Sequence, residues 1–205
     1  AEAFSRTSWN RTLVFAFFDE EELGLIGSRA FVEDYGSANE SSVAANLNFD
    51  PAGLHYPCGD AAGTYPVFLM ITESKVEGAA AIPGYKQVLD AARYGYLDAG
   101  VPPDKIRIST THAYLRVNGD PYSPPGSDDD SFDRADIPSI WMGAPPADEA
   151  GPLAVWGYPN HTPVDTAEMV EARCGSAETL VGGLQTALDA ALTALWALDA
   201  QVWDV

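Results

Sequence analysis

The sequence is poor in cysteine and histidine. Its 205 residues contain 2 cysteines and 3 histidines. Cys58 and Cys174 lie far apart and form no C-x-x-C motif, which excludes a zinc finger and a thioredoxin-like redox site. The sequence leaves open whether these two cysteines pair.

Positive charge is also scarce. The chain has 11 Lys and Arg against 30 Asp and Glu, a formal net charge of −19. A surface field of this sign repels phosphate backbones and anionic membranes, so we expect no nucleic-acid partner. Strong acidity is also found in proteins of salty or extracellular settings, and it favours a secreted protein here.

The sequence lacks a long uncharged apolar run and a signal peptide. No apolar stretch reaches the roughly 18 to 20 uncharged residues of a membrane span, so we expect no membrane partner. With a hydrophobic content of 46% we expect one globular domain over residues 1–205. The chain starts at Ala1 without an initiator methionine, which indicates a processed protein or a fragment.

Short apolar runs alternate with segments of helical periodicity. The runs predict strands at Thr12–Phe18, Val43–Phe49, Ile106–Thr110 and Ile137–Met142, the first of them buried on both faces. Helices are predicted at Ser28–Tyr35 with Ser28 as N-cap, at Tyr85–Leu97 and near Ser131–Arg134. Residues 166 to about 203 are predicted to form one long helix or two consecutive ones, in which Gly175, Gly182 and Gly183 mark a break or close packing. This alternation predicts an α/β fold with a mixed, mostly parallel sheet flanked by helices.

Carboxylates follow two of the predicted strands. Glu21 and Glu22 come just after the strand at 12–18, and Asp50 directly follows the strand at 43–49. Open α/β sheets bind ligands at such strand ends, and His161 lies in a loop that can reach the same crevice. Carboxylates and an imidazole suit a catalytic zinc ion, which uses nitrogen and oxygen ligands and keeps one position open.

Four segments carry a family resemblance. Phe18-Asp-Glu-Glu-Glu-Leu-Gly-Leu-Ile-Gly-Ser28 resembles the E-E-x-G-x-x-G-S segment of the M28 zinc peptidases, and Asn46-Leu-Asn-Phe-Asp50 resembles their N-x-D strand. Gly126-Ser-Asp-Asp-Asp-Ser-Phe132, with Asp136-Ile-Pro-Ser139, and Asn160-His-Thr-Pro-Val-Asp-Thr166 resemble two later motifs in the same order.

The resemblance implies a zinc-dependent exopeptidase that removes N-terminal amino acids from peptides or peptide-like substrates. In that family two zinc ions activate the water that attacks the peptide carbonyl. Carried over by position, Glu21 is the general base, Glu22 and His161 bind one metal, and Asp50 binds the other. The family also has an H-x-D motif and a bridging aspartate upstream. Residues 1–20 contain no histidine, so we expect those ligands to be missing and zinc binding to be weak.

Each site residue also has a purely structural interpretation. The three glutamates at 20–22 can form a solvated turn before a helix, Asp50 can be a turn residue before proline, and a loop histidine is commonly a surface residue. The three aspartates at 128–130 can bind calcium, although clustered acids more commonly lie in a solvated loop. The company of four ordered motifs favours the catalytic interpretation for Glu21, Glu22, Asp50 and His161.

Two other functions stay open at this stage. One is a catalytically inactive M28-like domain that acts as a binding or receptor module. The other is chemistry like that of glutaminyl cyclase, which uses a single zinc ion on a similar scaffold. Retention of the base together with three ligands favours the peptidase.

Overall fold

A computed structural model describes residues 8–36, 43–50, 52, 55–60, 63–109, 127–143, 163 and 166–200. Its central sheet has the strand order β1-β6-β4-β5, made of β1 (Asn46–Asn48), β6 (Ser139–Gly143), β4 (Val67–Met70) and β5 (Ile106–Ser109). β1 pairs with β6 and β4 with β5 in parallel, whereas β4 and β6 are antiparallel. The predicted mixed, mostly parallel sheet is confirmed.

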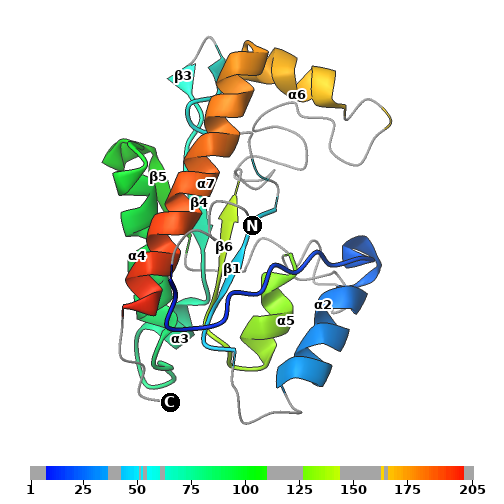
Figure 1. The fold of residues 1–205 in the computed structure, drawn as a ribbon, viewed down its shortest axis with the longest axis vertical. Helices are drawn as coiled ribbons and strands as arrows, with labels where there is room; N and C mark the ends of the chain where they lie inside the picture. Colours follow the sequence, from blue (N-terminus) through cyan, green and yellow to red (C-terminus); the bar gives the residue numbers. More distant parts are fainter. Residues whose placement is uncertain are drawn as a thin grey trace.

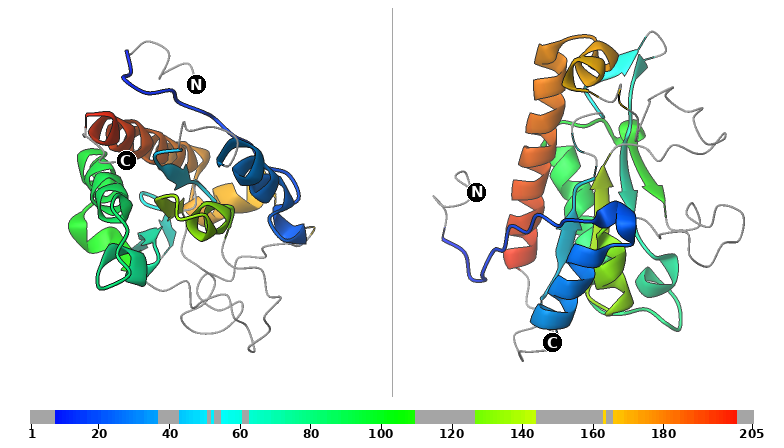
Figure 2. Two further views of the ribbon diagram at one scale, coloured as in Figure 1. Left: turned by 90° about the horizontal axis from the view of Figure 1, so that it is seen from below. Right: turned by 90° about the vertical axis from the view of Figure 1, so that its right-hand side faces the viewer.

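Two long helices cover the sheet. α4 (Tyr85–Asp98) and α7 (Ala177–Asp199) run side by side (Figures 1 and 2), and α4 contacts β4 and β6. Buried side chains of both helices meet those of the central strands in one main core. Its members include Val67, Leu69, Val88, Ala92, Tyr96, Ile140, Met142, Ala190 and Ala194.

Shorter helices gather at the β1 end of the sheet. α5 (Asp129–Arg134) contacts β1 and β6, and α2 (Ile26–Phe31) lies beside α5 (Figure 1) before continuing as the π-helical η2 (Val32–Gly36). Phe18 joins this group, with ring centroids 5.5 Å from Phe31 and 6.1 Å from Phe132. This aromatic contact holds the chain just before the acidic turn against α2 and α5.

A second, smaller core lies at the far end of α7. The hairpin of β2 (Gly59–Asp60) and β3 (Gly63–Thr64) is linked to α6 (Ala167–Cys174) by a disulfide between Cys58 and Cys174. The remaining elements are α3 (Glu73–Val76) and the 3-10 turns η1 (Glu21–Leu23) and η3 (Pro103–Lys105). The sequence left the cysteine pairing open, and the structure shows that they pair.

The predicted buried strand at Thr12–Phe18 is wrong. No strand pairing in the described part of the chain includes this segment, and Phe17 is 95% exposed. The carboxylate of Asp199, at the end of α7, accepts hydrogen bonds from the backbone N–H groups of Asn10 and Arg11 at 3.0 to 3.1 Å. From there the chain crosses to α2 (Figure 1). An apolar run shows that residues favour burial, but it does not supply the neighbouring strand that burial in a sheet requires.

The predicted helix at Ser28–Tyr35 begins one turn earlier than expected. Leu25, not Ser28, is the N-cap of α2, because both Gly24 and Leu25 adopt the left-handed conformation that turns the chain into the helix. Ser28 instead lies inside α2, where its hydroxyl is 2.7 Å from the hydroxyl of Ser131. The serine therefore joins α2 to α5 rather than capping a helix.

Most of the other predicted elements are confirmed within a few residues. α4, α5 and the strands β1, β5 and β6 lie where the sequence placed them, and Gly175 separates α6 from α7 with a φ of 85°. The strand β4 and the helix α3 were not predicted. Pro66 precedes β4 and the four strand residues are all apolar, a run too short to distinguish from a buried turn.

Helix α7 is long and apolar enough to cross a membrane by length and composition alone, with 33% of its most apolar window buried. The core helix of a globular protein passes the same test, so composition does not distinguish the two. In this structure α7 packs against α4 through Ala190 and Ala194.

His55 is completely buried beside the second core. Its Nε2 atom has no hydrogen-bond partner, and its ring meets the Tyr96 ring edge to face at 6.0 Å. Burial lowers the pKa of His55, although the Tyr56 carbonyl oxygen 3.1 Å from Nδ1 acts in the opposite direction. In the folded protein His55 therefore binds a proton less readily than in the unfolded chain, where histidine has its ordinary pKa of 6.5.

We expect the free energy of unfolding to fall as the pH drops below about 6.5, since the unfolded state then binds more protons than the folded state. The measurement is urea unfolding between about pH 5.5 and 7.5, compared with His55→Gln. Other groups titrate in this range, so the difference in slope between the two proteins isolates His55. Identical slopes would show that His55 does not resist protonation.

Candidate active site

The acidic turn owes its shape to residues with unusual backbone conformations. Glu20 has a φ of 56° and Gly24 a φ of 104°, and between them η1 presents Glu21 and Glu22. A Cβ at Gly27 would lie 2.6 Å from the carbonyl oxygen of Asp19, so only glycine lets α2 approach the start of the turn. The glycines of the predicted motif therefore define where the two glutamates lie.

Asp50 is held at the end of β1 by contacts with neighbouring elements. The Ser127 hydroxyl donates a 2.6 Å hydrogen bond to its carboxylate, and the Trp141 indole N–H donates to its backbone carbonyl oxygen. Trp141 belongs to β6, which pairs with β1 in parallel. One hydrogen bond thus orients the Asp50 carboxylate, and the other holds its backbone.

Glu21 shares its surroundings with other carboxyl groups. Its pKa is raised to about 7, first by burial and then by the negative charges of Glu22, Asp50 and Asp128. Glu21 therefore lies close enough to each of these carboxyl groups for its pKa to respond to their charges, although they come from η1, from the end of β1 and from the segment before α5. Glu22 and Asp50 thus both lie within electrostatic range of Glu21, and the role of these three residues as one catalytic site stays a prediction.

The start of α5 adds buried carboxyl groups that the sequence placed in a solvated loop. Asp129 is 1% exposed, and its pKa is raised well above the ordinary value by burial and by the charge of Asp130. The Asn48 side-chain amide and the Ser127 backbone N–H donate to its carboxyl group at 3.5 and 3.3 Å. The expectation of a solvated acidic loop is wrong, because α5 turns this segment toward β1.

Asp128 is the functional candidate that the sequence did not single out. One of its carboxyl oxygens is buried without a hydrogen-bond partner, and burial together with the charge of Asp50 raises its pKa, against a hydrogen bond from Ser28 that lowers it. The third motif contains Ser127-Asp128. Because two further aspartates follow, the sequence did not show which of the three lies near Asp50.

His161 lies outside the described residues, so its predicted place beside Glu22 stays a prediction. Within the described part of the chain, no group of three or more His, Cys, Asp or Glu side chains is arranged to hold a metal ion. Glu22 and Asp50 are the predicted ligands that this part contains.

The geometry now permits a comparison with known proteins. Residues 1–61 match the model of peptidase family M28. This segment contains the acidic turn, with Glu21 and Glu22, and the β1 strand followed by Asp50. The resemblance to the M28 family that the sequence motifs predicted is confirmed.

Solved structures of aminopeptidases are also similar to this chain. BSAP, a zinc aminopeptidase from Bacillus subtilis, is 22% identical, with a TM-score of 0.47 over 83% of this chain and 33% of its own. The aminopeptidase from Aneurinibacillus sp. strain AM-1 is 19% identical, with a TM-score of 0.44 over 82% of this chain and 31% of its own. This chain spans about a third of the length of either enzyme.

Proposed function

We propose that the chain contributes the general base and metal ligands of a zinc-dependent exopeptidase of the M28 type. The observation that supports the proposal is the effect of the charges of Glu22 and Asp50 on Glu21, with all three residues inside the segment that matches the M28 family. The substrate is a peptide or a small peptide-like molecule, from which the enzyme releases the N-terminal residue.

Glu21 is the general base of this proposal. A carboxylate with a pKa of about 7 takes a proton from the attacking water and returns it to the leaving amine at neutral pH, because neither protonation state is strongly favoured. Its backbone lies in η1, between left-handed residues on either side that set the course of the turn. The base is thus preorganised by the backbone of the turn.

The donors present are of the type that zinc prefers. Glu22 and Asp50 would supply carboxylate oxygens and His161 an imidazole nitrogen, so that Glu22 and His161 would hold one ion and Asp50 the other. Burial and then the negative charges of Glu22, Asp50 and Asp128 raise the pKa of Glu21, and a cation bound among these groups would offset the contribution of the charges. Zinc, when bound, supplies Lewis-acid activation of water and of the substrate carbonyl.

Zinc binding tests the ligand assignment. Glu22→Gln, Asp50→Asn and His161→Ala are each expected to weaken zinc affinity by at least about 10-fold, since each removes one donor. Zinc affinity is measured by competition with a chromophoric chelator. Hydrolysis of aminoacyl-anilides is measured in parallel with the full-length protein that the gene encodes. Glu20→Gln is the matched control, because it removes the same charge at the neighbouring exposed position.

Equal zinc affinity in the ligand variants and in Glu20→Gln would contradict the proposal. Zinc binding without hydrolysis would instead favour the inactive binding module, and cyclisation of N-terminal glutamine would favour the glutaminyl cyclase type. The Cys58–Cys174 disulfide and the acidic composition support a secreted or extracellular location, since disulfides persist in oxidising compartments.

A further inference from the structure

A modification motif lies near the start of the chain and has no part in the proposed peptidase site. Asn10-Arg11-Thr12 matches N-x-S/T with a middle residue other than proline, the pattern at which glycans are attached to the asparagine nitrogen of secreted proteins. The pattern is short and also arises by chance, so its surroundings in the fold decide whether it is used. Asn39 and Asn160 begin two further matches, but both lie outside the described residues.

The segment that contains the motif lies on the surface. It belongs to no described helix or strand, and both Asn10 and Thr12 are exposed. Figures 1 and 2 show this segment crossing the outer side of α7 near its C-terminal end. A glycan is bulky and hydrophilic, so it needs an acceptor that projects into solvent. Asn10 meets this requirement, and the threonine that completes the motif is accessible as well.

The Asn10 side chain keeps one N–H group available for substitution. Its Nδ2 atom donates to the Asp199 carboxylate at 3.1 Å, and its backbone N–H donates to the same carboxylate at 3.0 to 3.1 Å. A primary amide nitrogen has two N–H groups, and within the described residues Nδ2 has no second acceptor. An N-linked glycan replaces one hydrogen and leaves the other, so the bond to Asp199 is compatible with the modification.

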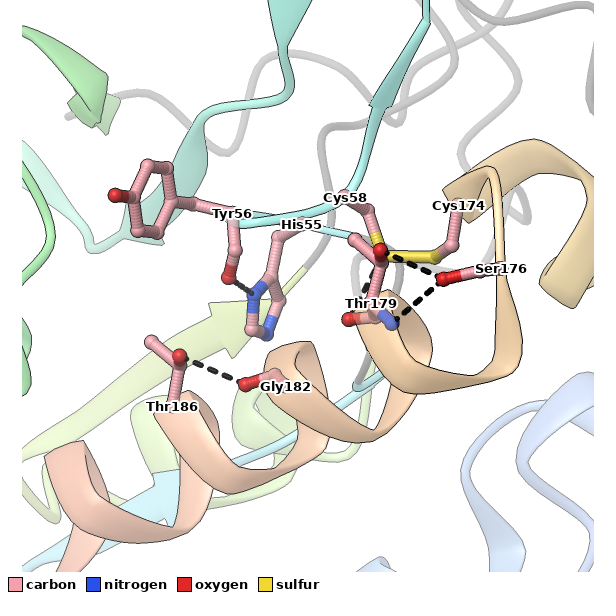
Figure 3. The surroundings of a disulfide bond; sticks show 8 residues. All are labelled: His55, Tyr56, Cys58, Cys174, Ser176, Thr179, Gly182 and Thr186. Carbon is pink, nitrogen blue, oxygen red and sulfur yellow. Dashed lines mark hydrogen bonds between the residues drawn. A yellow bond between two sulfur atoms is a disulfide. The ribbon is translucent and has the colours of Figure 1, made fainter.

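The disulfide is a second observation that points to a compartment where glycans are attached. Figure 3 shows it between the chain before β2 and the end of α6, and Cys58 and Cys174 are 0% and 3% exposed. Disulfides form and persist in secreted and cell-surface proteins and are rare in reducing compartments. N-glycans are carried by the same classes of protein. The buried disulfide and the acceptor motif therefore indicate the same route of maturation.

Exposed apolar side chains directly follow the motif. Val14 is 55% exposed and Phe17 is 95% exposed, and the segment 12–18 contains no charged residue, proline or glycine. An uncharged apolar segment with high β propensity favours pairing with strands of other chains. A hydrophilic glycan just before this segment would occupy the space through which another chain approaches.

We propose that Asn10 is an N-glycosylation site whose glycan shields the apolar segment 12–18. The donor is a lipid-linked oligosaccharide, in which a diphosphate joins the sugar to a polyprenyl lipid. The Asn10 Nδ2 atom attacks the anomeric carbon of the sugar, and an N–C bond forms as the C–O bond to the diphosphate breaks. The lipid diphosphate leaves, the amide proton passes to a basic group of the transferase, and nothing is oxidised or reduced. The site is independent of the proposed peptidase activity.

Mass spectrometry of the protein isolated from its natural source tests the site. The peptide that contains Asn10 is expected to carry sugar residues on that asparagine, whereas the peptide that contains Asn46, which begins no acceptor motif, carries none. Thr12→Ala, produced in the same host, should abolish the modification, although Asn10 and its bonds to Asp199 are unchanged. Thr12→Ser keeps the motif and should keep the glycan. An unmodified Asn10 in the natural protein would overturn the proposal.

The second test measures the shielding role by sedimentation velocity. Thr12→Ala should self-associate at a protein concentration at least about 10-fold lower than Thr12→Ser does, because the apolar segment is then uncovered. Adding Phe17→Ser to Thr12→Ala removes the most exposed apolar side chain of the segment and should return the association to within about 2-fold of Thr12→Ser. Equal self-association of the glycosylated Thr12→Ser and the unglycosylated Thr12→Ala proteins would overturn the shielding role.

Discussion

Glu21→Gln is expected to lower the hydrolysis of aminoacyl-anilides by at least about 100-fold, because glutamine keeps the shape of the side chain but accepts no proton from water. Zinc affinity should change little, since Glu21 is the base and not a ligand in this proposal. The rate of hydrolysis is measured at saturating zinc with the full-length protein that the gene encodes, and Glu20→Gln is the matched control.

The fold should survive this substitution. The raised pKa of Glu21 shows that its charged form is unfavourable in the folded protein, so that stability is lost as the pH rises through about 7. A neutral glutamine avoids this loss, and Glu21→Gln should unfold at no lower urea concentration than the original protein above pH 7. Activity within about 3-fold of the original rate would remove Glu21 from the role of base.

Gly95→Ala is expected to destabilise the protein by about 1 to 3 kcal/mol, the usual cost of overpacking a close contact. A Cβ at Gly95 of α4 would lie 2.2 Å from the backbone carbonyl oxygen of Ala190 in α7. Alanine gains about 1 kcal/mol in helix propensity over glycine, but the two helices must separate to admit the methyl group. Urea and thermal unfolding, followed by circular dichroism, measure the net effect.

The same substitution at Gly182 is the control. There the nearest atom to an added Cβ is the Pro57 ring carbon Cγ at 3.2 Å, which can shift by a few tenths of an ångström. Gly182→Ala should therefore change stability by much less than Gly95→Ala. Equal or higher stability of Gly95→Ala would mean that α4 and α7 are not in backbone contact.

Much of the site was predictable because its residues belong to short, local patterns. Glu21, Glu22 and Asp50 follow apolar runs, and the glycines after the acidic pair belong to the motif that carries the family resemblance. The structure shows the reason, since Gly24 has a positive φ and Gly27 allows a close approach to Asp19. Backbone requirements of this kind act over a few residues and are therefore visible in a sequence.

The partners of a side chain were less predictable. Asp128 and Asp129 belong to a run of three acids that resembles a solvated loop, and only the packing of α5 against β1 buries Asp129 and turns Asp128 toward Asp50. For the apolar segment 12–18 the prediction overstated burial. The segment is strand-like in composition, but within the described residues no strand pairs with it.

By itself, the sequence determined the kinds and approximate bounds of most helices and strands, the acidic turn and the excess of negative charge, because propensity, periodicity and charge are properties of neighbouring residues. Tertiary structure alone decided that Cys58 pairs with Cys174, that β4 runs antiparallel to β6, and that the charges of Asp50 and Asp128 act on Glu21. These depend on contacts between residues far apart in the chain, whose geometry exists only once the core has formed.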